Sequence, residues 1–145
     1  MPRILITNDD GIESVGLEAL YEAASSLGDV FVFAPNSNQS ATGHSLTLSR
    51  PLRVKEIKKQ WFSVDGTPTD CVNVALNGFL EERIPDLILS GINIGTNLGD
   101  DVTYSGTIAA AMEGTLEGLP ALSTSVASFQ WKNFNFAAEL TMDIA

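Results

Sequence analysis

Short runs of apolar residues constrain the fold of this chain more than any other feature. They lie within residues 3–7, 30–34 and 86–90, and residues 120–126 supply a fourth candidate. Their length, their lack of polar alternation and their β-branched or large side chains are typical of strands buried on both faces. The sequence therefore predicts a parallel sheet whose two faces are both covered.

Helical patterns separate these strands. Between the first two, apolar residues recur at helical spacing over residues 17–27, with Ser14 available as the N-cap. A cap at Thr67 followed by Pro68 predicts a second helix that runs to about Leu80. Two more helices are expected, one at 105–118 that buries Ile108, Ala111, Met112 and Thr115, and one at 134–145.

The order of these elements predicts the fold class. Strands that alternate with helices form right-handed βαβ units and an α/β fold with a doubly wound, Rossmann-like sheet, mostly parallel and flanked by helices. Residues 45–57 and 61–64 look like short extended pieces that would form a small antiparallel arm at the sheet edge. Because 145 residues are the size of one domain, we expect residues 1–145 to form a single α/β domain.

Composition restricts what the chain is expected to bind. Eighteen acidic and eight basic residues give a net charge of −10, which opposes the binding of nucleic-acid polymers, so no such partner is expected. No apolar stretch is long enough to span a bilayer, and the first residues lack a basic region followed by an apolar one. We therefore expect a cytoplasmic protein with no membrane partner. The single cysteine, Cys71, is expected to be a small core residue.

Three polar segments leave the predicted parallel strands at their carboxyl ends, where ligands bind in open α/β sheets. They span residues 8–11, 35–44 and 91–107. If the third strand lies beside the first, on the opposite side from the second, a crevice opens where the strand order reverses. That crevice would lie between the first segment and Asn93.

The first segment carries two adjacent acids, Asp9 and Asp10. Neighbouring carboxylates repel each other at neutral pH, and a divalent, oxygen-preferring cation would remove that repulsion. The alternative interpretation is a polar turn, because Asn, Asp and Gly are the residues that turns select. Likewise, Ser105 to Thr107 could begin a helix with an anion site or simply provide an ordinary serine N-cap.

Five motifs follow one another in an order that is specific to a known family. The first is a strand followed by Asn-Asp-Asp-Gly, and the second is an Ala-Pro loop that ends at Ser40–Ser45. The third is the helix start at 66–72, the fourth is the loop Ser-Gly-Ile-Asn-x-Gly-x-Asn-x-Gly at 90–99, and the fifth is Tyr104–Thr107. Together they cover most of residues 3–126, and the chain resembles the SurE family, the survival-protein-E, metal-dependent 5′/3′-nucleotidases.

The resemblance implies an activity and a set of site residues. The expected activity is that of a phosphomonoesterase that hydrolyses nucleoside 5′- and 3′-monophosphates to nucleoside and phosphate. A divalent metal ion, Mg²⁺ or Mn²⁺, would polarise the phosphoryl group and activate a water molecule, with Asp9 and Asp10 as the catalytic pair. The resemblance implies metal ligands at Asp9, Asp10, Ser40 and Asn93, and phosphate contacts from Asn97, Ser105, Gly106 and Thr107.

The resemblance also implies a larger protein and an assembly. Family members continue well beyond 145 residues, so we expect a C-terminal portion to be missing from this sequence. The last helical pattern agrees, because it stops without a cap residue, glycine or proline. The native protein is expected to be a homodimer or homotetramer.

Other classes of protein fit the residues less well. A receiver domain, a Mg²⁺-binding phosphoacceptor module in signalling, also pairs acids after its first strand, but it needs an Asp and a Lys at later strand ends. Those ends are Ala34, Ser90 and Val126 here. A haloacid-dehalogenase-type phosphatase needs two Asp separated by one residue, whereas Asp9 and Asp10 are adjacent. A dinucleotide-binding module needs Gly-x-Gly-x-x-Gly after a strand, and no predicted strand here is followed by that motif. His44, the only histidine, remains a candidate for proton transfer that the resemblance does not require.

Overall fold

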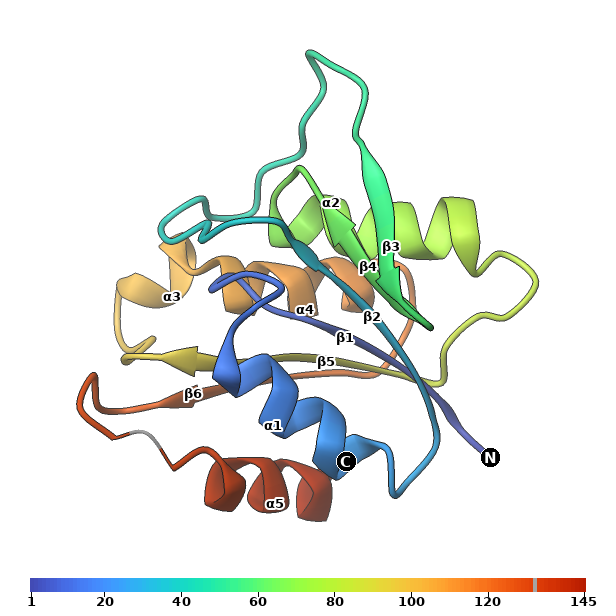
Figure 1. Cartoon of the computed structure of the whole chain (residues 1–145). Coiled ribbons are helices and arrows are strands. Elements are labelled where there is room, and N and C mark those ends of the chain that lie inside the picture. Colours follow the sequence, from blue (N-terminus) through green and yellow to red (C-terminus); the bar gives the residue numbers. More distant parts are fainter. Residues whose placement is uncertain (132) are drawn as a thin grey trace.

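In the computed structural model, which describes residues 1–131 and 133–145, six strands form one sheet (Figure 1). All neighbouring strands are parallel except β3 and β4, which pair antiparallel at one edge. The predicted fold class is therefore confirmed, as is the small antiparallel arm. In sheet order, the strands are β3 (Val54–Lys58), β4 (Trp61–Val64), β2 (Asp29–Pro35), β1 (Arg3–Thr7), β5 (Leu87–Ile94) and β6 (Ala121–Val126).

Helices cover both faces of this sheet (Figure 1). α1 packs against α5 on one face, and α2 packs against α4 on the other. No helix among the residues described is long and apolar enough to cross a bilayer. The helices are α1 (Val15–Ala24), α2 (Pro68–Val74), the π-helix η1 (Ala75–Phe79), α3 (Asp101–Tyr104), α4 (Gly106–Leu116) and α5 (Asn135–Ile144).

β1 lies in the middle of the sheet, paired with β2 on one side and β5 on the other. Its residues Ile4, Leu5 and Ile6 are at most 1% exposed. Alternate side chains of a strand point to opposite faces, so Ile4 and Ile6 pack beneath α1 and α5, whereas Leu5 packs beneath α2 and α4. This explains the uninterrupted apolar run. β5 lies on the opposite side of β1 from β2, which is the arrangement under which the sequence predicts a crevice.

The buried face of α4 differs from the prediction. Met112 and Thr115 are exposed, and Glu113 and Gly114 are buried instead. A Cβ on Gly114 would lie 2.4 Å from Cδ1 of Ile88, so the helix lies too close to the sheet for large side chains. The apolar pattern predicted the wrong face because this helix is rich in Gly and Ala, which are small enough to pack on any face of a helix.

Three segments near the strand ends also differ from the prediction. β3 begins only at Val54, and residues 45–53 form no strand. The Asp70 side chain holds that segment instead, because it accepts hydrogen bonds from the backbone N–H and the Oγ1 of Thr47, at 2.8 and 2.6 Å. β5 continues to Ile94 and α3 forms within the predicted loop.

The close contact between α1 and β5 gives a testable prediction. A Cβ on Gly16 would lie 2.2 Å from the carbonyl oxygen of Ile92, so Gly16→Ala must push the helix away from the sheet. We expect the free energy of unfolding to fall by about 1–3 kcal/mol, measured by urea denaturation. Gly78→Ala is the matched control, because no atom lies within 4 Å of its added Cβ and stability should stay the same or rise. Equal stability of the two variants would contradict this packing.

Candidate active site at the carboxyl ends of β1 and β5

The turn after β1 is built by Asn8 and Gly11. Asn8 Nδ2 donates to the carbonyl oxygen of Gly11 at 2.8 Å, and the Gly11 N–H donates back to Asn8 Oδ1 at 3.1 Å. Gly11 has a φ of +106°, a conformation that favours glycine. Because these two residues close the turn, the side chains of Asp9 and Asp10 are not needed as turn formers.

Asp9 joins three parts of the chain. Its side chain is buried, and its Oδ1 accepts a hydrogen bond from Thr107 Oγ1 in the first turn of α4 at 2.9 Å. Its backbone carbonyl accepts from the N–H of Gln39, in the loop after β2, at 2.7 Å. Burial raises the pKa of Asp9, and the bond from Thr107 opposes that rise. A nearby positive charge would stabilise a carboxylate in this position.

Asp10 is half-buried and turns toward β5. Its Oδ2 accepts a hydrogen bond from the backbone N–H of Ile94 at 3.1 Å. Burial raises its pKa from 3.8 to about 6; the bond from Ile94 lowers it, and the charge of Asp9 raises it further. The two acids therefore leave the same strand end in different directions, and ionising both is unfavourable.

A hollow of about 270 Å³ opens beside Asp9 at this edge of the sheet. Asp10, Gly106 and Thr107 do not line it, but each lies against a residue that does. Asp10 is bonded to Ile94, which lines the hollow, and a Cβ on Gly106 would lie 3.1 Å from Cβ of Asp9. Five residues that the resemblance implicates line the hollow, namely Asp9, Ser40, Asn93, Asn97 and Ser105.

The hydrogen bonds of Asn93 and Ser40 leave oxygen lone pairs free. Asn93 is buried, and its Nδ2 donates to the carbonyl oxygen of Gly95 at 3.0 Å, which leaves Oδ1 as an acceptor. Ser40 Oγ donates its proton to Asn38 Oδ1 at 2.5 Å and keeps its lone pairs. In the part of the chain that the structure describes, no three His, Cys, Asp or Glu residues cluster as metal ligands. The available set of carboxylate, amide and hydroxyl oxygens fits a hard cation such as Mg²⁺ or Mn²⁺.

The first turn of α4 lies against Asp9. Ser105 Oγ accepts a hydrogen bond from the N–H of Ile108 at 3.2 Å, so the serine N-cap is confirmed. The backbone N–H groups of Gly106 and Thr107 have no partner within the helix, because the first N–H groups of any helix lack one. They carry the positive end of the helix dipole, which favours an anion.

His44 has a different position from the other candidates. Its Nε2 lies 2.6 Å from Oε2 of the buried Glu113, on α4. The ring does not line the hollow beside Asp9. Its observed contact attaches the loop after β2 to α4.

Three further large or charged side chains line the hollow, although the sequence analysis gave them no site role: Asp101, Tyr104 and Phe129. Asp101 and Tyr104 belong to α3, a short helix that no periodic pattern predicts. Phe129 follows β6, which ends at the same edge as β1 and β5. The rule that ligands bind beyond the carboxyl ends of parallel strands could have included it.

Comparisons with known proteins show the family of the chain. The model of the family described as survival protein SurE matches residues 4–145. The chain belongs to the SurE family. A 5′-nucleotidase SurE of Geotalea daltonii is 54% identical over 144 residues, which cover 99% of the chain and 58% of that relative. A 5′-nucleotidase SurE of Myxococcus xanthus is 54% identical over 135 residues, covering 93% of the chain and 51% of the relative.

A solved structure of SurE protein from Aquifex aeolicus has the same fold. It superposes with a TM-score of 0.94 at 48% sequence identity, covering 99% of the chain and 58% of that structure. The chain thus spans a little over half the length of the SurE relatives that it matches.

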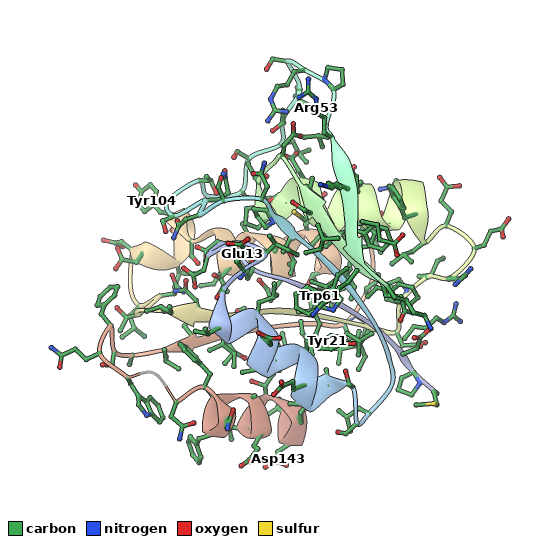
Figure 2. The ribbon with its side chains drawn as sticks, in the orientation of Figure 1. Glu13, Tyr21, Arg53, Trp61, Tyr104 and Asp143 are labelled. Atoms are coloured by element: carbon green, nitrogen blue, oxygen red, sulfur yellow. The ribbon has the colours of Figure 1, made fainter. Side chains whose placement is uncertain are left out.

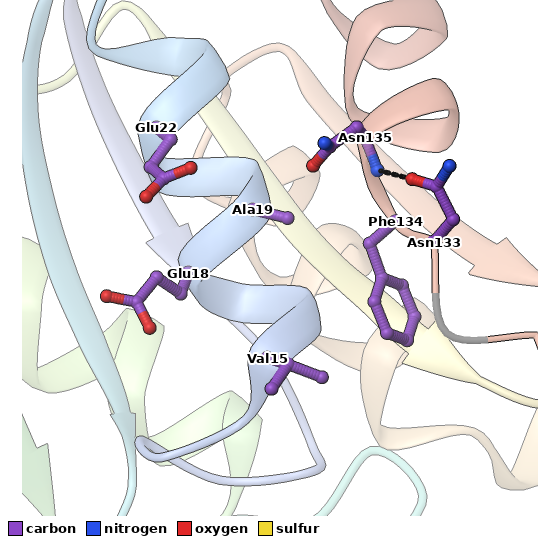
Figure 3. A pocket seen from close by; sticks show the side chains of 7 residues that line it. All are labelled: Val15, Glu18, Ala19, Glu22, Asn133, Phe134 and Asn135. Carbon is purple, nitrogen blue, oxygen red and sulfur yellow. Dashed lines mark hydrogen bonds between the residues drawn. The ribbon is translucent and has the colours of Figure 1, made fainter.

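A larger hollow of about 650 Å³ lies elsewhere on this SurE-family chain, between α1 and the start of α5 (Figure 3). Val15, Ala19 and Phe134 lie between the two helices, and Glu18 and Glu22 of α1 also line the hollow (Figure 3). Both glutamates are exposed. The hollow beside Asp9 is smaller, but it combines buried polar groups with several strand ends, so we assign the candidate site there.

The raised pKa of Asp10 predicts how stability depends on pH without metal. The folded protein holds a proton on Asp10 more readily than the unfolded chain does, so stability falls as pH rises from about 4 to about 6. Asp10→Asn removes this titration. The free energy of unfolding of the variant, relative to that of the wild type, should therefore be higher at pH 7 than at pH 4. Because solvent screens a half-buried group, we expect this increase to be about 1–2 kcal/mol.

Urea denaturation in EDTA at both pH values measures this difference. Glu13→Gln, a change at a nearby exposed acid, should leave the pH dependence as in the wild type. An Asp10→Asn variant that tracks the wild type at both pH values would contradict the raised pKa.

Proposed function

We propose that the protein is a metal-dependent phosphomonoesterase that hydrolyses nucleoside 5′- and 3′-monophosphates to nucleoside and phosphate. The observation that carries the proposal is the hollow in which a buried carboxylate, Asp9, lies with the amide of Asn93 and with Ser105, the N-cap of α4. Membership of the SurE family supports it, as does the 5′-nucleotidase name of the relatives.

The charges of the hollow support a cation requirement. Asp9 and Asp101 line it, and its described lining contains no lysine or arginine. The chain as a whole carries a net charge of −10, so a phosphate monoester would be repelled without a cation. Asp9, Asp10, Ser40 and Asn93 would hold a divalent ion, Mg²⁺ or Mn²⁺, which when bound would polarise a phosphoryl oxygen as a Lewis acid and lower the pKa of a water molecule.

The chain's own residues orient the substrate in this proposal. The free N–H groups of Gly106 and Thr107 bind phosphate oxygens at the positive end of α4. Asn97 uses one amide N–H on Ser125 Oγ, at 2.6 Å, and keeps the other for the phosphate. Thr107 holds the Asp9 carboxylate in a fixed orientation through its hydrogen bond.

Phosphate release from a panel of nucleoside 5′- and 3′-monophosphates tests the proposed function. We expect release with Mg²⁺ or Mn²⁺, a fall to background in EDTA, and recovery when the metal ion is added in excess. Activity that is indifferent to chelation would refute the metal dependence. A failure to release phosphate from every nucleotide would refute the nucleotidase activity itself.

The two acids should be essential for turnover. Asp9→Asn and Asp10→Asn each remove a negative charge from the proposed metal site, so we expect kcat to fall by about 100- to 1,000-fold. Asp143→Asn is the matched control, because this exposed acid lies on α5, far from Tyr104 at the rim of the hollow (Figure 2). Circular dichroism should show that all three variants are folded. Normal hydrolysis by the Asp9 and Asp10 variants would show that these carboxylates have no catalytic role.

We also propose a homodimer or a larger homo-oligomer. α5 exposes apolar side chains, with Phe136 60%, Leu140 50% and Ile144 66% exposed. Exposed apolar patches of this kind favour association. Light scattering over a range of protein concentrations should give a mass above that of one chain, and a monomer at every concentration would contradict the proposal. A cytoplasmic location stays a prediction from the sequence.

A further inference from the structure

Two exposed aromatic side chains stand at the rim of the hollow beside Asp9. Tyr104 ends α3 and is 65% exposed, and Phe129 follows β6 and is 80% exposed. Figure 1 shows that α3 and the segment after β6 reach the same end of β5 from opposite sides. Because both rings are mostly exposed to solvent at the edge of a polar hollow, packing in the core does not explain their position.

Phe129 is held in this position by a glycine. A Cβ on Gly95, directly after β5, would lie 2.7 Å from both Cε1 and Cζ of the Phe129 ring. The ring therefore lies against the backbone of Gly95, and any larger residue there would displace it. The close approach positions the ring at the wall of the hollow and leaves most of its surface in solvent.

The size of the hollow indicates what the rim must do. At about 270 Å³ the hollow is smaller than the roughly 300–1,000 Å³ of sites that bury a whole drug-sized ligand. With the phosphate beside Asp9, the remainder of a nucleotide would extend out of the hollow, past the exposed rings of Tyr104 and Phe129 that line it. Resting on the proposed nucleotidase function, we propose that Tyr104 and Phe129 form the subsite that binds the nucleobase.

The chemistry of the rim sets the expected specificity. Every base has a flat π-face, so stacking on an aromatic ring tolerates any base. Neither ring offers a paired donor and acceptor that would read a base edge. The subsite therefore distinguishes nucleoside monophosphates from sugar phosphates without a base, and it discriminates weakly among bases.

A neighbouring hollow offers a different position for the base. It measures about 250 Å³, shares Thr96 and Asn97 with the first, and is lined by Leu98 and Ile108. Leu98 is 69% exposed. It lacks an aromatic ring in its described lining, so the stacking argument favours Tyr104 and Phe129.

Comparing a nucleotide with its base-free counterpart tests the subsite. kcat/KM is measured for adenosine 5′-monophosphate, cytidine 5′-monophosphate and ribose 5-phosphate. We expect Tyr104→Leu and Phe129→Leu each to lower kcat/KM by about tenfold or more on both nucleotides, through KM, and to leave ribose 5-phosphate unchanged. Tyr104→Phe and Phe129→Tyr should restore the preference. Phe136→Leu, at an exposed aromatic of α5, should leave every substrate unaffected.

The outcomes separate this inference from the proposed function. Equal losses on nucleotides and ribose 5-phosphate would overturn the subsite, because the residues would then act on the phosphate or the fold. A nucleotide-selective loss in Leu98→Ala, with none in the aromatic variants, would overturn it in favour of the neighbouring hollow.

If the wild type releases no phosphate from any substrate, the proposed function is wrong, and calorimetric titration then decides the subsite alone. Tighter binding of the nucleotide than of ribose 5-phosphate, lost in Phe129→Leu, supports the subsite. Equal binding of the two ligands overturns it.

Discussion

The pairing of β1 with strands on both of its sides is the constraint on which the rest of the structure depends. β2 and β5 flank it in parallel, so the chain must cross over the sheet on each side with a covering helix. The strand order reverses at β1, and the loops after β1 and β5 diverge there to leave an open edge. A single buried tripeptide, Ile4 to Ile6, thus fixes both the two-sided core and the position of the site.

At that edge, one carboxylate holds the converging segments together. Asp9 is bonded through its side chain to Thr107 on α4 and through its backbone to Gln39 in the loop after β2. Its neighbours in sequence close the turn, which frees it from that role. Because residues from four separate segments reach the hollow, the rigidity of the sheet determines the geometry of the site.

The sequence predicted what periodicity and strand ends control. The buried parallel strands follow from apolar runs. The meeting of Asp9 with Asn93 and Ser105 follows from the carboxyl-end rule, once β1 lies between β2 and β5. The face of α4 that is exposed was not predicted correctly, because the spacing between this helix and β5 is set by Gly114 and not by apolar periodicity. α3 and the ring of Phe129 depend on tertiary contacts, such as the one with Gly95, that local patterns do not encode.

The same burial that fixes the geometry makes the site unfavourable when both acids are ionised and no cation is bound. The pKa values of both Asp9 and Asp10 are raised by desolvation, which means that the fold holds their charges at a cost. A chain selected only for stability would place amides or apolar groups at these positions. Unfavourable carboxylates beside a helix N-terminus instead support the proposed cation site, since a bound cation would offset the cost of ionisation. The cost of ionising these buried carboxylates is therefore consistent with a function that requires a positive charge between the protein and an anionic substrate.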